Sequence, residues 1–164
     1  MRRHALKAHE PSRLERPLNE RPTPHLSRRE LLAWRGALEM RARLLPIMAA
    51  TIRGKDLSLP EFDILYQLWR APECRCRVGV LASELLATPG GVSRLAARLA
   101  DRGLVSRHRD RGRQAVEIKL TAQGETRLLA AMSVHFREIK ELFVDRLDDQ
   151  DIVRLVSIWH RSVA

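Results

Sequence analysis

Apolar residues recur every three or four positions over residues 27–53, a spacing that predicts one long amphipathic helix. Ser27 and Glu30 have the spacing of a capping box at its start, and Gly54 marks its end. Pro46 lies inside the segment, where we expect it to kink the helix. The apolar stripe consists of Leu31, Trp34, Leu38, Ala42, Leu45, Ala49 and Ile52.

A second helix is predicted after Ser58. Ser58 and Glu61 form another capping box, and Pro60 lies in the first turn, where a proline is well tolerated. Pro72 stops this helix because proline cannot continue the hydrogen-bond ladder. Its apolar face is lined by Phe62, Leu65, Leu68 and Trp69.

The next two helices are separated by a tight turn. The first covers roughly residues 79–86, and the second begins at the capping residue Thr88, followed by Pro89, and closes at Gly103. Two strands are then predicted over residues 105–108 and 116–120, joined by a polar, arginine-rich turn. Helix, turn, basic helix and basic hairpin in this order are typical of a winged helix-turn-helix.

Two more helices are predicted toward the end of the chain. Thr121 caps a long one with a heptad-like apolar stripe, and Asp148 and Asp151 open the last one. A winged segment is too small to cover these stripes and that of residues 27–53. Because exposed apolar surface is costly, we expect a two-fold homodimer, with an intramolecular bundle as the alternative.

The predicted fold is therefore mainly α-helical with a small β wing. The winged helix-turn-helix covers residues 58–121, and residues 27–53 and 122–164 form long dimerisation helices within one domain of residues 27–164. Residues 1–26 have four prolines and many charges without an apolar period, so we expect a basic, disordered tail.

The net charge of +10 favours a polyanionic partner, most often nucleic acid, although a merely soluble basic protein remains the alternative. The charge is concentrated in one place. Seven arginines lie between residues 94 and 113, opposed only by Asp101 and Asp110, whereas residues 121–164 carry six basic and seven acidic side chains. This concentration coincides with the predicted second helix of the helix-turn-helix and its hairpin, which favours double-stranded DNA.

One face of the helix that follows Thr88 is predicted to contact DNA. Glycines in its first turn allow close approach, an arginine there can donate two hydrogen bonds to guanine, and arginines at the hairpin tip suit phosphates or a minor groove. The alternative is a helix start packed through glycine, with solvated arginines. The predicted DNA-binding residues are Thr88, Pro89, Gly90, Gly91, Ser93, Arg94 and Arg98 on the helix and Arg109, Arg111 and Arg113 in the hairpin.

Four motifs in order make the sequence similar to MarR-type winged helix regulators: Leu-Ser-Leu-Pro-Glu-Phe at 57–62, Thr-Pro-Gly-Gly-Val-Ser-Arg-Leu at 88–95, Arg-Gly-Leu-Val at 102–105 and Leu-Thr-Ala-Gln-Gly at 120–124. The resemblance covers residues 27–164. It implies a homodimer on a pseudo-palindromic operator, repression, and a pocket for aromatic or phenolic compounds between the dimerisation and DNA-binding parts. The family's Asp-x-Arg wing pattern falls on Gly112 and Gln114, so the arginine that enters the groove is not assigned.

These observations predict a sequence-specific DNA-binding repressor that a small ligand releases. Candidate pocket residues are Trp34, Met48, Phe62, Trp69 and Met132, with ordinary core packing as the alternative. A redox-sensing regulator is another alternative, because Arg75 and Arg77 flank Cys74 and Cys76 and nearby cations lower a thiol pKa. A non-specific DNA-binding protein is the third.

The sequence has no phosphate-cradling loop, nucleophile elbow or metal-binding histidine spacing, so we expect neither an enzyme nor a cofactor or metal site. It has no run of about 18 apolar residues and no secretory signal. We therefore expect a cytoplasmic, nucleoid-associated bacterial protein without membrane contact.

Overall fold

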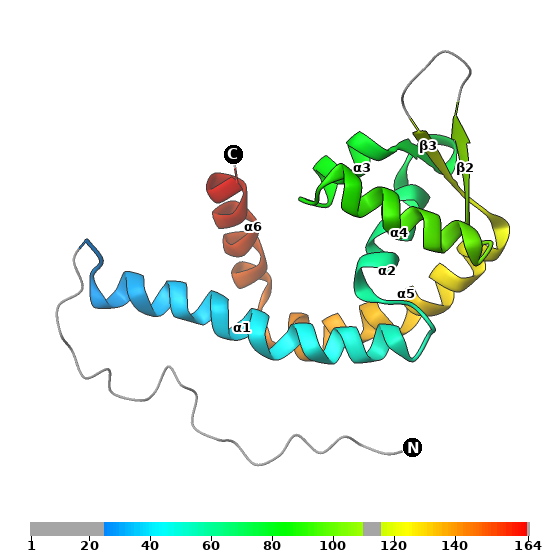
Figure 1. Cartoon of the computed structure of the whole chain (residues 1–164). Coiled ribbons are helices and arrows are strands. Elements are labelled where there is room, and N and C mark those ends of the chain that lie inside the picture. Colours follow the sequence, from blue (N-terminus) through cyan, green and yellow to red (C-terminus); the bar gives the residue numbers. More distant parts are fainter. Residues whose placement is uncertain (1–24, 110–115, 164) are drawn as a thin grey trace, which may run out of the picture. The chain divides into compact units, whose positions relative to one another are not determined.

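The computed structural model describes residues 25–109 and 116–163 (Figure 1). Almost all of the predicted tail, residues 1–26, lies outside these ranges. The chain divides into two compact units, residues 1–46 and residues 47–164, and each is described by itself.

In the first unit, helix α1 (Arg28–Arg53) begins with the predicted capping box. The Ser27 amide donates to Glu30 Oε2 at 2.7 Å, and the Glu30 amide donates to Ser27 Oγ at 3.3 Å. The residues on both sides of Pro46 are helical, and the last turns of α1 belong to the second unit.

The second unit contains the winged helix-turn-helix and the C-terminal helices (Figure 1). Its elements are α2 (Leu59–Arg70), the 3-10 turn η1 (Pro72–Cys74), β1 (Arg75–Arg77), α3 (Val78–Glu84), α4 (Pro89–Asp101), β2 (Val105–Arg109), β3 (Val116–Leu120), α5 (Ala122–Leu142), the 3-10 turn η2 (Val144–Arg146) and α6 (Asp149–Val163).

The three strands form one antiparallel sheet in the order β1-β3-β2. Strands β2 and β3 are the predicted hairpin, but β1 was not predicted. It has only three residues, which are too few to show an alternating pattern, and Glu73 and Cys74 before it have positive φ angles of 52° and 53°.

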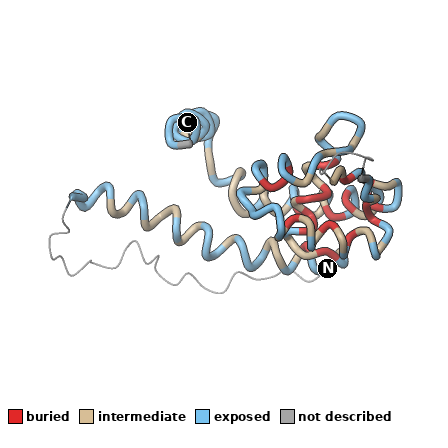
Figure 2. Tube along the Cα trace, turned by 45° about the horizontal axis from the view of Figure 1, so that its top comes forward, coloured by how far each residue is buried: buried red, intermediate tan, exposed pale blue. Residues whose placement is uncertain are grey.

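The core lies between α2, α3, α4, the sheet and α5 (Figure 2). The prediction that Trp69 belongs to the apolar face of α2 is wrong, because Trp69 is 37% exposed while Ile64 is fully buried. Helix α6 has few buried side chains, and most of its residues are exposed (Figure 2). Among the described helices, none is both long enough and apolar enough to span a bilayer.

Candidate nucleic-acid interface

Helix α4 begins as the sequence predicts. Thr88 has an extended backbone, and its Oγ1 accepts a hydrogen bond from the Gly91 amide at 3.2 Å. Gly90 is exposed and a Cβ there would meet nothing within 4 Å, so the first turn presents bare backbone to the outside. A phosphate or a groove wall could therefore approach this helix end closely.

The two sides of α4 have different chemistry. Val92, Ala96 and Leu99 are buried against the core, as expected for the inward face, although Leu95 is only half-buried. Arg94 and Arg98 are exposed on the other side. The helix thus holds two cationic side chains in solvent on a firmly packed base.

The wing contacts α4 through Arg107 on strand β2. Its Nη2 donates to Ser93 Oγ at 3.5 Å, so an exposed wing arginine lies beside the exposed face of α4. Sequence reasoning did not assign Arg107 to the site. The strand periodicity could have done so, because Arg107 and Arg109 alternate with Ser106 and His108 and share one face.

The other wing predictions are less accessible. Arg109 ends strand β2, where its backbone pairs with Val116 of β3. Arg111 and Arg113 lie outside the described residues, and so does the turn that would show which arginine reaches furthest. The assignment of these three arginines to DNA stays a prediction.

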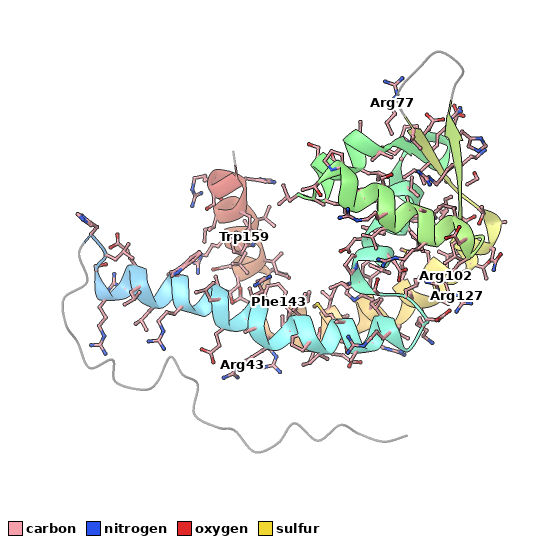
Figure 3. The ribbon with its side chains drawn as sticks, viewed as in Figure 1. Arg43, Arg77, Arg102, Arg127, Phe143 and Trp159 are labelled. Atoms are coloured by element: carbon pink, nitrogen blue, oxygen red, sulfur yellow. The ribbon has the colours of Figure 1, made fainter. Side chains whose placement is uncertain are left out.

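Arg102 follows α4 directly, but carboxylates hold it. Its Nη1 lies 3.2 Å from Glu61 Oε1 and its Nη2 lies 3.1 Å from Asp56 Oδ2, while Arg127 lies 3.5 Å from the same Asp56 oxygen. Figure 3 shows Arg102 and Arg127 near each other beside the ends of α4 and α5. The cluster anchors the recognition helix to α2 and α5, and it removes Arg102 from the set of free cations.

Glu61 connects this cluster to the cap of α2. Burial by itself raises its pKa, but hydrogen bonds from the backbone and side chain of Ser58 and the charges of Arg102 and Arg98 outweigh that effect. The pKa of Glu61 is therefore lowered and the side chain is ionised at neutral pH, as its ion pair with Arg102 requires.

A cavity of about 510 Å³ lies next to the cluster, and none of the five predicted pocket residues lines it. Its walls are Gly54, Lys55, Asp56, Gln123, Thr126, Arg127 and Ala130. Of the predicted five, Phe62 is buried, Met48 and Met132 are half-buried, and Trp69 is partly exposed, while Trp34, in the other unit, is 59% exposed. The assignment of these residues to a ligand stays a prediction.

Phe62 does contact an unusual polar group. Its ring packs edge-on against His135 of α5 with centroids 4.9 Å apart. Within the described part of the chain, His135 Nδ1 and Glu138 Oε2 are buried without hydrogen-bond partners, although Thr51 Oγ1 donates to Glu138 Oε1 at 2.6 Å. Burial lowers the pKa of His135, against the opposing charge of Glu138.

The two cysteines lie in different surroundings. Both are free and half-buried; Cys74 lies in η1 and Cys76 in β1. Burial raises the pKa of Cys76, contrary to the expected effect of its arginine neighbours. A less acidic thiol is less reactive, which argues against Cys76 as a redox sensor. No group of three or more metal-binding side chains was found among the residues that the structure describes.

The helix-turn-helix, the exposed arginines of α4 and the adjacent antiparallel hairpin define a winged helix protein. Residues 55–114 match the model of the MarR family. The HTH-type transcriptional repressor YetL of Bacillus subtilis (strain 168) is 30% identical over 105 residues, which are 63% of each chain. The chain thus spans 63% of the length of this curated relative.

Solved structures of MarR family regulators have the same fold. Sco3205 from Streptomyces coelicolor, in complex with DNA, is 23% identical with a TM-score of 0.79 over 88% of this chain and 91% of that one. The organohalide-sensing regulator RdhR-CbdbA1625, bound to 2,4-dichlorophenol, is 20% identical with a TM-score of 0.70 over 88% and 85%. The resemblance to the MarR-type winged helix family and the predicted fold class are therefore confirmed.

Proposed function

We propose that the protein is a sequence-specific DNA-binding transcriptional regulator that represses as a homodimer and releases its operator when a small aromatic ligand binds. One observation carries the DNA-binding part. Exposed Arg94 and Arg98 lie on a helix whose opposite face is buried, and Arg107 of the wing lies next to them. Rigidly held arginines beside bare helix-start backbone suit a major groove and its phosphates.

The similar proteins support the remaining parts of this proposal. YetL is named a transcriptional repressor, Sco3205 was solved with DNA and RdhR-CbdbA1625 was solved with a chlorinated phenol. By analogy, residues 88–98 and the wing arginines contact the operator, and a phenol is the first ligand class to test. Repression, the dimer and the ligand are inferences from this analogy.

The test begins with selection of binding sites from a random duplex pool by the full-length protein, with competitor DNA at two salt concentrations. Arg94→Ala should weaken binding to the selected site about tenfold or more and relax preference at one base pair, because a bidentate arginine–guanine contact is lost. Arg137→Ala on α5 removes the same charge from an exposed position outside the winged segment. It should stay within about twofold of the wild type.

A selection that enriches no sequence, together with binding that competitor DNA abolishes, would refute the regulator and favour non-specific DNA binding. For the ligand, 2,4-dichlorophenol is titrated into the protein–DNA complex. Release of the duplex at ligand concentrations that leave the protein folded supports the ligand-responsive repressor. Unchanged affinity across phenols would remove that part of the proposal and leave DNA binding intact.

A further inference from the structure

The wing sheet has a basic outer face, on the side away from the core. Residues directly opposite each other in the register share a face, so Arg77, Glu117 and His108 form one row across the three strands, and Arg75, Lys119 and Ser106 form the next. Cys76 and Ile118 alternate with them and point inward, where Ile118 is fully buried. The outer face therefore carries three permanent cations.

The two arginines of β1 differ in their partners. Arg75 is bonded to Glu73, and its Nη1 lies 3.8 Å from Glu117 Oε2. Glu117 is directly opposite Arg77 in the register, yet its printed ion pair is with Arg75 on the diagonal. Within the described ranges Arg77 is exposed and has no ion pair, and Figure 3 shows it projecting away from the ribbon beside β3.

Arg77 also lies at the end of the sheet that faces outward along the hairpin. Its row is one residue from the last described pair of the hairpin, Arg109 with Val116. Arg107 lies on the opposite face of the sheet, toward α4. The wing thus presents one exposed arginine on each face near its outer end.

We infer that Arg77 binds a DNA phosphate on the far side of the minor groove from α4, while Arg107 serves the near side. A hairpin entering a groove about 6 Å wide has a phosphate strand along each of its faces, so a free cation is needed on both. This inference rests on the proposed DNA-binding function. It adds a contact from β1, a strand outside the helix-turn-helix and hairpin that the function was built on.

The test compares Arg77→Ala with Lys119→Ala on the selected duplex over a range of salt concentrations. Lys119 is the matched control because it is exposed on the same face, one row further from the outer end. Arg77→Ala should weaken binding about three- to tenfold at low salt and reduce the salt slope by about one ion per site contacted. Its loss should be equal on the selected duplex and on duplexes with substituted bases. Lys119→Ala should change affinity by less than about twofold.

Arg77→Lys keeps the charge and should retain the salt slope, which separates a phosphate contact from a folding defect. Hydroxyl-radical footprinting should lose protection at one position across the minor groove in Arg77→Ala alone. Equal, small effects of Arg77→Ala and Lys119→Ala, with an unchanged footprint, would overturn the inference while wild-type binding stands. Absence of selective binding by the wild type would instead overturn the proposed function and this inference together.

Discussion

Leu86, in the turn between α3 and α4, has a conformation that suits other residues better. Its φ is +49° and its side chain is 97% exposed. The left-handed region costs an ordinary L-residue about 1 kcal/mol or more, and asparagine tolerates it best after glycine. The strained residue also explains why α3 ends at Glu84 instead of reaching Leu86.

Leu86→Asn should therefore raise the free energy of unfolding by about 0.5–1 kcal/mol, measured by urea denaturation. Val80→Asn is the control, since Val80 is 50% exposed but lies within α3. It should give no gain, because asparagine is no better than valine inside a helix. Equal effects of the two substitutions would show that backbone strain at Leu86 is not the cause.

His135 gives the protein a dependence on pH. Burial lowers its pKa, so the folded state prefers the neutral ring more strongly than the unfolded state does. The stabilisation from this residue is complete above the unfolded pKa of about 6.5, and it is lost as the pH falls through that value toward the lower folded pKa. Acidification thus forces a proton onto a buried ring beside Phe62.

His135→Phe removes the titrating group and keeps an aromatic ring next to Phe62. We expect the variant to lose less stability than the wild type between about pH 7.5 and 5.5, a window above the titration of ordinary carboxylates. Thermal or urea unfolding at several pH values measures the difference. Parallel pH profiles of the two proteins would mean that His135 does not govern this dependence.

At the residue scale, the site could be predicted only in part. The cap at Thr88 and the exposed positions of Arg94 and Arg98 follow from helix periodicity. That Arg102 is bound by Asp56 and Glu61 could not be foreseen, because both carboxylates lie more than 40 positions away in sequence. Long-range ion pairs decide which arginines are free, and local patterns do not contain them.

Among the elements, the junction of α4, β2 and α5 has the tightest fit. Thr121 Oγ1 donates to the Gly103 carbonyl at 2.7 Å and accepts from the Gly124 amide at 3.0 Å. A Cβ on Gly124 would lie 1.9 Å from the Leu104 carbonyl oxygen, so only glycine fits there. This contact sets how closely the start of α5 approaches the strand that leads into the wing.

Gly124→Ala should therefore destabilise the fold by about 1–3 kcal/mol, because backbone atoms must move to admit the methyl group. Gly79→Ala is the matched control, since a Cβ there meets nothing within 4 Å. It lies in α3 and should be neutral or slightly stabilising, as expected for glycine replaced by alanine in a helix. Urea denaturation of both variants decides; equal stabilities would contradict the tight packing.

The elements were predictable wherever they carry their own start and stop residues. Helices α1, α2, α4 and α5 begin at Ser27, Ser58, Thr88 and Thr121 as the capping patterns indicate, because those hydrogen bonds are made within three residues. Strand β1 carries no such signal. It exists because β3 offers it a partner more than 40 residues later, which is a tertiary cause.

At the scale of the whole molecule, apolar surface is left uncovered. On α6 the exposed apolar residues are Ile152, Val153, Val156, Ile158 and Trp159. On the part of α1 that belongs to the first unit, Trp34, Leu38 and Leu45 are exposed. Clustered apolar surface of this kind marks an interaction site, and a second copy of the chain is the partner that a regulator of palindromic DNA requires.

Val156→Asp places a carboxylate in the apolar stripe of α6, where the side chain is now 48% exposed. Burying that charge in a dimer interface is costly, so we expect dimerisation to weaken about tenfold or more. Ser157→Asp introduces the same charge on the neighbouring polar side of the helix and should leave dimerisation unchanged. Sedimentation equilibrium of the full chain measures both.

Affinity for DNA should follow dimerisation. Two winged helix units held together bind two half-sites at a high effective concentration, and a monomer loses that gain. Val156→Asp should therefore bind the full selected site much more weakly than the wild type, yet bind a single half-site with unchanged affinity, because α4 and the wing are untouched. A Val156→Asp protein that stays dimeric would instead favour the intramolecular bundle, in which α6 covers its stripe within one chain.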